Sequence, residues 1–277
     1  MNNILKIRSI NDIHLEFGDF TVRPLPEDKE TVLVLAGDIG IVHKTTQLKD
    51  YVTFMERCSK QFREVVVIMG NHEHYHGSFK KTATVIRNAI QHLDNVHLLE
   101  KSVHVIDNVA FIGATLWTDC DNGSPHAVYL FNGMADAKLI RTGHTSDKDP
   151  YQRKFNSGDT ILDHIKAKDF IEKEIVVQRE AGRKIVLVVH HGITPKSIAE
   201  MYRGDSMNMF FVSDLTLDLM DWNVDLVVHG HLHNFSDYQI DTAGSICQTR
   251  VVCNPRGYIG YEGKEQTGFN DSLIIEV

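Results

Sequence analysis

Five apolar runs in this sequence each end in side chains that can bind metal ions or move protons. The run 65–69 ends at Gly70, Asn71, His72 and Glu73. The other four runs lead to Asp12 and His14, to Asp38, to His190 and His191, and to His231 and His233. Carboxylate, imidazole and amide oxygen together form a ligand set for Mn, Fe or Zn, and no thiolate accompanies them to indicate a purely structural zinc. These residue types therefore predict the chemistry of bound divalent metal ions.

The elements that must position these side chains are buried parallel strands. Open α/β sheets bind ligands outside the carboxyl ends of their strands, and near-continuous apolar runs are typical of strands buried on both faces. Asp12 and His14 are two residues apart, as are His231 and His233. On an extended backbone both side chains of such a pair project to one side. We therefore expect each pair to bind one metal cluster from a strand end.

The order of these motifs along the chain resembles the calcineurin-like metallophosphoesterase superfamily. The motifs are DxH, GD, GNHE, H and GHxH, and they run in family order from residue 12 to residue 233. The resemblance implies two metal ions, the first held by Asp12, His14, Asp38 and His233, and the second by Asp38, Asn71, His190 and His231, with Asp38 bridging. It also implies that His72 faces the phosphate, where it protonates the leaving oxygen or stabilises the transition state.

Two choices concern residues close to this set. His190 directly follows its strand, where the histidine of the family usually stands, so we predict His190 as the ligand. His191 is then a contact of the substrate or of the ligands. Arg256 lies in a segment, 254–257, that looks like one in some bacterial members of the family. A salt-bridge role is the ordinary expectation for this arginine, and bidentate contact with phosphate is the alternative.

One position departs from the family pattern. The protein phosphatases of the superfamily read GDxxDRG, and Ile41 stands here where their carboxylate would orient the catalytic histidine. A protein Ser/Thr phosphatase is therefore disfavoured. Either Glu73 or a backbone carbonyl is left to orient His72, and the sequence does not decide between them.

The charges of the predicted site favour an anionic substrate. Two divalent ions bring four positive charges, and Asp12 and Asp38 return only two negative ones. A metal also lowers the pKa of bound water from about 15.7 to about 7. We predict a phosphoesterase in which metal-bound hydroxide attacks a phosphate-ester small molecule or nucleotide, with a phosphodiester slightly favoured over a monoester because the GDxxDRG pattern is missing.

Two other functions compete with this prediction. A non-catalytic, metal-binding interaction scaffold of the same fold would be expected to lose His72 or a ligand, and this chain retains them all. A metal-dependent nuclease is possible but not favoured, because nucleic-acid surfaces are usually basic and the formal net charge is −8.

Length and composition predict one domain over residues 1–277, since 42% of the residues are hydrophobic. The absence of a signal-peptide pattern and of any long apolar run predicts a cytoplasmic protein with no membrane span. The four cysteines are then expected to be reduced thiols. The sequence gives no indication of the oligomeric state.

The resemblance implies an α/β fold, a four-layer αββα sandwich of two mixed sheets flanked by helices. Helical spacing predicts helices near 48–62, 85–93, 159–180 and 213–219, and a hairpin is expected at 103–114. Strands at 236–241, 246–253 and 273–275 are expected to complete the second sheet. Residues 118–157 show no sustained period and predict an irregular insert, either a substrate-facing flap or a solvated loop.

Overall fold

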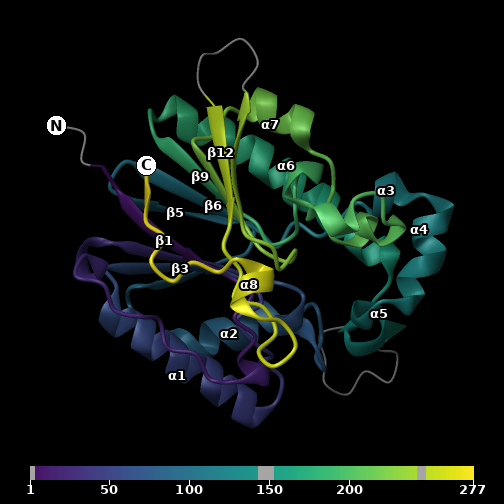
Figure 1. Cartoon of the computed structure of the whole chain (residues 1–277), viewed down its shortest axis with the longest axis horizontal. Coiled ribbons are helices and arrows are strands. Elements are labelled where there is room, and N and C mark those ends of the chain that lie inside the picture. Colours follow the sequence, from purple (N-terminus) through teal and green to yellow (C-terminus); the bar gives the residue numbers. More distant parts are fainter. Residues whose placement is uncertain (1–3, 143–152, 242–247) are drawn as a thin grey trace.

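The computed structural model describes residues 4–142, 153–241 and 248–277. Two β-sheets pack face to face, and helices cover their outer faces (Figure 1). The first sheet has the order β13-β1-β2-β3-β4. Its strands are β1 (Lys6–Ile10), β2 (Val32–Ala36), β3 (Glu64–Ile68), β4 (Val96–Leu99) and β13 (Ile275–Glu276). The predicted αββα sandwich is confirmed.

The second sheet has the order β11-β12-β10-β9-β6-β5. Its strands are β5 (Ser102–Ile106), β6 (Val109–Gly113), β9 (Lys184–Val188), β10 (Leu226–His229), β11 (Ser236–Asp241) and β12 (Gln248–Cys253). The expected hairpin is present, because β5 and β6 pair antiparallel. The strands β9 and β10, whose ends carry predicted ligands, are parallel neighbours at the centre of this sheet.

One expectation about the strands was wrong, and one strand was missed. The last strand belongs to the first sheet, since β13 pairs antiparallel with β1 through Lys6 and Glu276. Leu273 and Val277 beside it pack into the core between the sheets, which explains why the C-terminus returns to this edge. The strand β4 was not predicted. It is only four residues long and His97 interrupts its apolar pattern.

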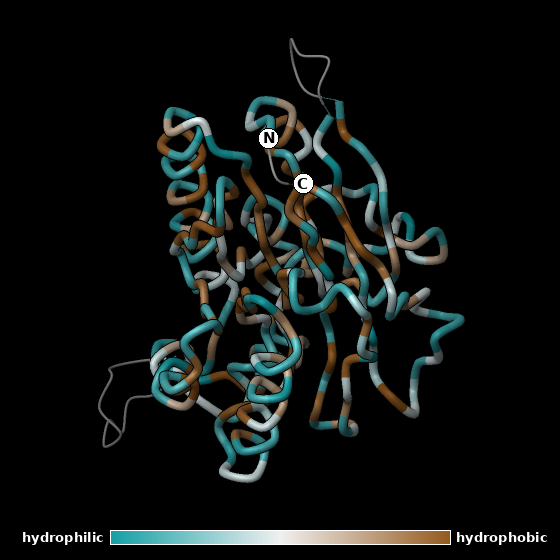
Figure 2. The backbone as a smooth tube through the Cα atoms, turned by 90° about the vertical axis from the view of Figure 1, so that its left-hand side faces the viewer, coloured by the Kyte–Doolittle hydropathy of each residue, from teal (hydrophilic) through white to brown (hydrophobic). Residues whose placement is uncertain are grey.

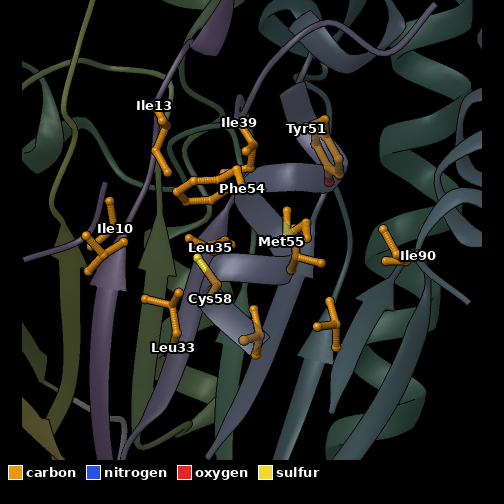
Figure 3. Close-up of a cluster of buried hydrophobic side chains, with 14 of the residues drawn as sticks. Ile10, Ile13, Leu33, Leu35, Ile39, Tyr51, Phe54, Met55, Cys58 and Ile90 are labelled. Atoms are coloured by element: carbon orange, nitrogen blue, oxygen red, sulfur yellow. The ribbon is translucent and has the colours of Figure 1, made fainter. Parts of the chain in front are cut away.

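Alternate residues of each central strand point into different layers. Val34 of β2 and Val186 of β9 belong to the core between the two sheets. Leu33 and Leu35 of β2 point the other way and pack against the helices of the first sheet (Figure 3). In Figure 2, where the backbone is coloured by hydropathy, apolar strand segments lie in the interior between more polar helices. Burial on both faces is why the strands read as unbroken apolar runs.

The covering helices largely follow the predicted periodicity. On the first sheet lie α1 (Thr45–Gln61) and α2 (Thr82–Ile90), and on the second lie α6 (Ser157–Glu180) and α7 (Thr216–Trp222) (Figure 1). Ala167, Ile171 and Ile175 recur every fourth residue of α6 and are buried against the second sheet. Asn156 and Asp159 form a capping box at its start, which fixes where the helix begins.

The stretch 118–157 is not irregular throughout. Its described part contains α3 (Cys120–Gly123), α4 (Pro125–Leu130) and α5 (Ala135–Leu139), and a small separate sheet of β7 (Arg141–Thr142) and β8 (Arg153–Lys154). Trp117, Phe131 and Phe155 give these elements an apolar cluster of their own. Helices of four to six residues are too short to show a period, so the sequence pattern missed them. Whether this part acts as a flap stays a prediction.

Two further expectations concern membranes and cysteines. None of the helices in the described ranges has the length and hydropathy needed to cross a membrane. Cys58, Cys120 and Cys253 are buried free thiols, in agreement with the prediction. Cys247 lies outside the described residues.

A buried arginine ties the first strand to two distant loops. The guanidinium of Arg8 donates from Nη1 to Asp28 Oδ1 at 2.7 Å and to the carbonyl of Arg23 at 3.0 Å, and from Nη2 to the carbonyl of Asp271. Only 1% of Arg8 is exposed. Removing one partner of a buried ion pair leaves an uncompensated charge.

We expect Arg8→Ala to lower the free energy of unfolding by about 3–5 kcal/mol because the Asp28 carboxylate then loses its cation. Urea denaturation followed by circular dichroism measures this. Arg87→Ala, on the exposed face of α2, is the control and should change stability by less than about 0.5 kcal/mol. A loss of similar size in both variants would contradict the assigned role of Arg8.

Candidate metal centre

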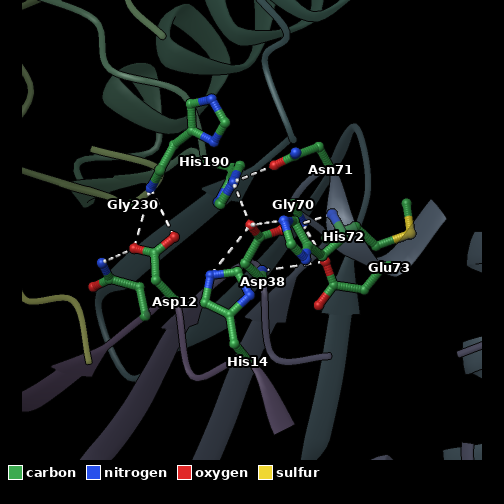
Figure 4. A network of polar contacts seen from close by, with 12 residues as sticks. Asp12, His14, Asp38, Gly70, Asn71, His72, Glu73, His190 and Gly230 are labelled. Atoms are coloured by element: carbon green, nitrogen blue, oxygen red, sulfur yellow. Dashed lines mark hydrogen bonds and ion pairs between the residues drawn. The ribbon is translucent and has the colours of Figure 1, made fainter. Parts of the chain in front are cut away.

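The predicted ligands come together where strands of both sheets end (Figure 4). Asp12 and His14 follow β1, Asp38 follows β2, Asn71 follows β3, His190 follows β9, and His231 and His233 follow β10. Nε2 of His14 lies 3.0 Å from Nε2 of His233. Nε2 of His190 lies 3.1 Å from Oδ1 of Asn71. The structure therefore places side chains from five strand ends in one buried cluster.

Asp38 lies at the middle of this cluster. Its Oδ2 is 3.7 Å from Nε2 of His14 and 3.5 Å from Nε2 of His190. On one side, Asp12, His14 and His233 have ligand atoms within 4.8 Å of one another. On the other side, the ligand atoms of Asp38, His190 and His231 meet the same limit. Two adjacent groups joined by one carboxylate fit a pair of neighbouring cations.

An orphaned imidazole nitrogen supports the fit to metal ions. Nε2 of His231 is buried and has no hydrogen-bond partner in the described parts of the chain. A buried polar atom without a partner is costly, and a cation would supply one. The donor set, with imidazole, carboxylate and amide oxygen and without thiolate, suits Mn, Fe or Zn.

The backbone brings these residues together through left-handed conformations. Asp12 and His14 have φ of 50° and 51°, and Asp38, His231 and His233 have φ of 53°, 70° and 46°. The expectation that each pair projects from an extended backbone was therefore wrong, because β1 and β10 have already ended. Non-glycine residues with positive φ are uncommon and strained, and they cluster at functional sites.

Hydrogen bonds hold the rings of two of these histidines in place. Nδ1 of His190 donates to the carbonyl of Ala36 at 2.8 Å, and Nδ1 of His233 donates to Glu262 Oε2 at 2.7 Å. These hydrogen bonds leave both Nε2 atoms directed at the cluster. Contacts of this kind fix the tautomer and orientation of a metal-binding histidine.

Asn71 is oriented by a carboxylate from the insert and by the nearby Tyr75. Its Nδ2 donates to Asp136 Oδ1 at 2.9 Å and to the Tyr75 hydroxyl at 3.0 Å, so the amide oxygen faces His190. Asp136 lies on α5 and is buried. This carboxylate was not predicted, because nothing local links it to Asn71, which is 65 residues away.

His72 is held beside Asp38 by a second carboxylate. Its backbone N–H donates to Asp38 Oδ1 at 2.8 Å, and its Nδ1 donates to Glu16 Oε1 at 2.6 Å. Nε2 of His72 then lies 3.9 Å from Asp38 Oδ2 and 3.2 Å from the Tyr258 hydroxyl. Burial opposes protonation of His72, but the charges of Asp38 and Glu16 outweigh it and raise the pKa of His72 to about 9.

The group that orients His72 is Glu16. The same Oε1 also accepts a hydrogen bond from His14 Nδ1 at 3.2 Å. Burial raises the pKa of Glu16, but these two histidines outweigh it and lower that pKa to about 2. Glu73 or a carbonyl was the expected orienting group, and Glu16 was not predicted, although it continues the spacing of Asp12 and His14.

Comparison with known proteins agrees with this geometry. The family model of the calcineurin-like phosphoesterases matches residues 5–235. The chain belongs to this family. It is a metallophosphoesterase hydrolase, and its buried His and Asp groups fit a dimetal site.

Individual relatives of this phosphoesterase are distant in sequence. An uncharacterized protein of Acanthamoeba polyphaga mimivirus is 22% identical over 293 residues, which is 98% of this chain and 96% of that protein. The crystal structure of a phosphopantetheinyl hydrolase from Mycobacterium tuberculosis is similar with a TM-score of 0.60 at 14% identity, covering 92% of this chain and 90% of that one. A dimetal phosphatase from Danio rerio gives a TM-score of 0.54 at 12% identity, covering 92% and 88%. At these identities the solved structures support the fold alone.

Glu73 and Arg256 of this phosphoesterase form hydrogen bonds with backbone groups and do not face the metal cluster. Glu73 is fully buried and accepts hydrogen bonds from the backbone N–H of Gly70 at 2.7 Å and of Ile39 at 2.7 Å. The guanidinium of Arg256 donates to the carbonyls of Ile13 at 2.8 Å and of Gly18 at 3.1 Å. Among the described residues Arg256 bonds to backbone carbonyls and forms no salt bridge, so the expected salt-bridge role was wrong, and its contact with phosphate stays a prediction.

His191 of this phosphoesterase lies next to His231, one of the predicted ligands. Its ring is buried 4.3 Å from the His231 ring and 5.0 Å from the Trp117 ring. Burial lowers its pKa well below the ordinary value, so the ring is neutral. The structure therefore places His191 against a predicted ligand, and its role stays a prediction.

Glycines at three strand ends leave room for the ligands. A Cβ on Gly70 would lie 2.1 Å from Asp38 Oδ1 and 2.6 Å from His190 Cε1. A Cβ on Gly230 would lie 2.8 Å from Asp12 Oδ2, and one on Gly37 would lie 2.6 Å from His190 Nδ1. The glycine of each motif is thus explained by the closeness of a ligand.

We expect Gly70→Ala to lower metal content and turnover, because the new methyl group displaces Asp38 and His190. Bound metal per chain measured by elemental analysis, together with phosphoesterase rates, tests this. Gly133→Ala is the matched control, since a Cβ there meets no atom within 4 Å. Unchanged metal content in Gly70→Ala would contradict the assigned packing.

Proposed function

We propose that this chain hydrolyses a phosphate ester, with a phosphodiester favoured over a monoester, using two divalent cations of the Mn, Fe or Zn type. The observation that carries the proposal is the convergence of seven metal-type side chains in one buried cluster, with Asp38 at its middle and His72 beside it. The proposed ligands are Asp12, His14, Asp38 and His233 for one ion, and Asp38, Asn71, His190 and His231 for the other.

When bound, the two cations supply a water of lowered pKa and positive charge for the phosphoryl oxygens. The chain contributes only Asp12 and Asp38 as carboxylates among the proposed ligands, so the loaded centre keeps a net positive charge. That charge is fixed in place before the reaction, which suits an anionic substrate and its transition state.

The role proposed for His72 is to donate a proton to the leaving oxygen. Its Nδ1 is held by Glu16, so Nε2 faces the cluster and the Tyr258 hydroxyl. A raised pKa keeps a proton on the ring near neutral pH. General acid catalysis of this kind contributes about 10²–10⁴-fold to a rate.

The preference for diesters is supported by the surroundings of His72. Ile41 stands where the protein phosphatases carry a carboxylate, and Glu16 reaches His72 from another loop. An interaction scaffold without catalysis is less well supported, since all the proposed ligands and His72 are retained and held in place.

The test is a metal-dependent assay on p-nitrophenyl phosphate and bis-p-nitrophenyl phosphate. Turnover should appear with added Mn, disappear after chelation and be faster on the diester. Elemental analysis should find two metal ions per chain. Absence of metal-dependent turnover on both esters and on nucleotides would overturn the proposal.

A further inference from the structure

A cavity of about 380 Å³ lies beside the metal centre. His231 and His233 form part of its wall, Tyr258 and Glu262 form another part, and residues 198–211 supply much of the rest. Small-molecule sites commonly measure about 300–1,000 Å³. An ester bound at the proposed ligands would therefore place one of its organic groups in this cavity.

The charges around the cavity disfavour a second anion. Asp205 and Glu262 line it, and no lysine or arginine does so among the described residues. Arg203, the one cation in the segment 198–211, is exposed and pairs with Glu200 at 2.9 Å. Like charges brought together at a binding site oppose binding. A further phosphate or carboxylate on the substrate would meet carboxylates here.

The apolar part of the wall suits a flat ring. Met207, Phe211 and Leu232 line the cavity. The Phe211 ring is stacked on the His231 ring, with centroids 4.8 Å apart and planes at 28°. Aromatic rings add to such stacks in offset or edge-to-face geometry, and each such pair is favourable.

The polar part of the wall presents acceptors. Nδ2 of Asn208 donates to the carbonyl of Tyr202 at 2.7 Å, and Oδ1 of Asp205 accepts from the N–H of Met207 at 2.8 Å. No partner is recorded in the described ranges for Oδ1 of Asn208 or Oδ2 of Asp205. Free acceptor oxygens are complementary to hydroxyl or amino donors on a ligand.

We propose that this cavity binds the alcohol part of the ester, and that this part is an uncharged aromatic group carrying hydrogen-bond donors. That the bound alcohol is part of a substrate rests on the proposed phosphoesterase function. Binding of the alcohol in the cavity does not depend on that function. Phe211 supplies the stacking surface, and Asp205 excludes anions.

A binding experiment tests the cavity apart from catalysis. The metal-loaded full chain is saturated with inorganic phosphate and titrated with 4-aminophenol or 4-hydroxybenzoate, followed by saturation-transfer NMR. We expect 4-aminophenol to bind about 10-fold more tightly than the anion. Phe211→Ala should weaken the binding of 4-aminophenol, and Tyr129→Ala, an exposed aromatic on α4, should not. Equal binding of the two alcohols, or no effect of Phe211→Ala, would overturn the inference.

A kinetic experiment tests the role of Asp205. The wild type should show a higher kcat/KM on 4-aminophenyl phosphate than on 4-carboxyphenyl phosphate. The same order is expected for the methyl diesters of these two phosphates. Asp205→Lys, at an exposed position, should reduce or reverse this preference. Asp94→Lys, an exposed carboxylate far along the chain, is the matched control.

The two proposals fail in different ways. Equal kcat/KM on both esters would overturn the cavity inference and leave the phosphoesterase function standing. Selective binding of 4-aminophenol without turnover of any ester would support the cavity and overturn the proposed function.

Discussion

Asp38→Asn is expected to lower phosphoesterase turnover by about 10³-fold, which is equivalent to about 4 kcal/mol of transition-state stabilisation. The reason is its position, because Oδ2 of Asp38 lies within 4 Å of Nε2 of both His14 and His190. A neutral amide in its place adds one net positive charge to the proposed centre and removes the shared anionic ligand. Elemental analysis should find fewer than two metal ions per chain.

A matched carboxylate separates this effect from a general one. Asp94→Asn removes an exposed carboxylate outside the cluster and should leave metal content and rate unchanged. If Asp38→Asn kept both metal ions and full turnover, Asp38 could not bridge them and the arrangement proposed for the centre would be wrong.

His72→Asn is expected to lower kcat by about 10²–10⁴-fold while the protein keeps both metal ions. The imidazole is placed beside Asp38 by Glu16 but is not among the proposed ligands. If His72 protonates the leaving oxygen, the loss should be larger for an alkyl leaving group than for p-nitrophenolate, which leaves without a proton. Rates on bis-p-nitrophenyl phosphate and on a dialkyl phosphodiester, in which either leaving group is an alkoxide, test this when metal content is measured beside them.

His76→Asn is the histidine control for this experiment. His76 is exposed, and its φ of 63° is a conformation that asparagine tolerates. Its substitution should leave the rate unchanged. A His72→Asn variant that loses the same factor on good and poor leaving groups would show that His72 stabilises charge rather than donating a proton.

The local sequence pattern determined the strands and most of the proposed site. Apolar runs such as 32–36 and 185–189 have no polar residue to place in solvent, so they predict strands buried on both faces, and the structure has them there. The residues after those runs then had to meet at the carboxyl edge of the sheets. Strand ends are local features, which is why the sequence was sufficient to bring Asp38 and His190 together.

The tertiary structure decided which groups orient those side chains. Glu16 contacts His72 across 56 positions, and Asp136 contacts Asn71 across 65. Asp136 does not stand out by its neighbours in the chain, and the only local signal of Glu16 is that it continues the spacing of Asp12 and His14. Contacts between distant segments also decide the edge at which β13 pairs. The short helices of the insert depend on such contacts in the same way. Periodicity is a property of consecutive residues, whereas the partner of a buried polar atom depends on how the loops between strands pack.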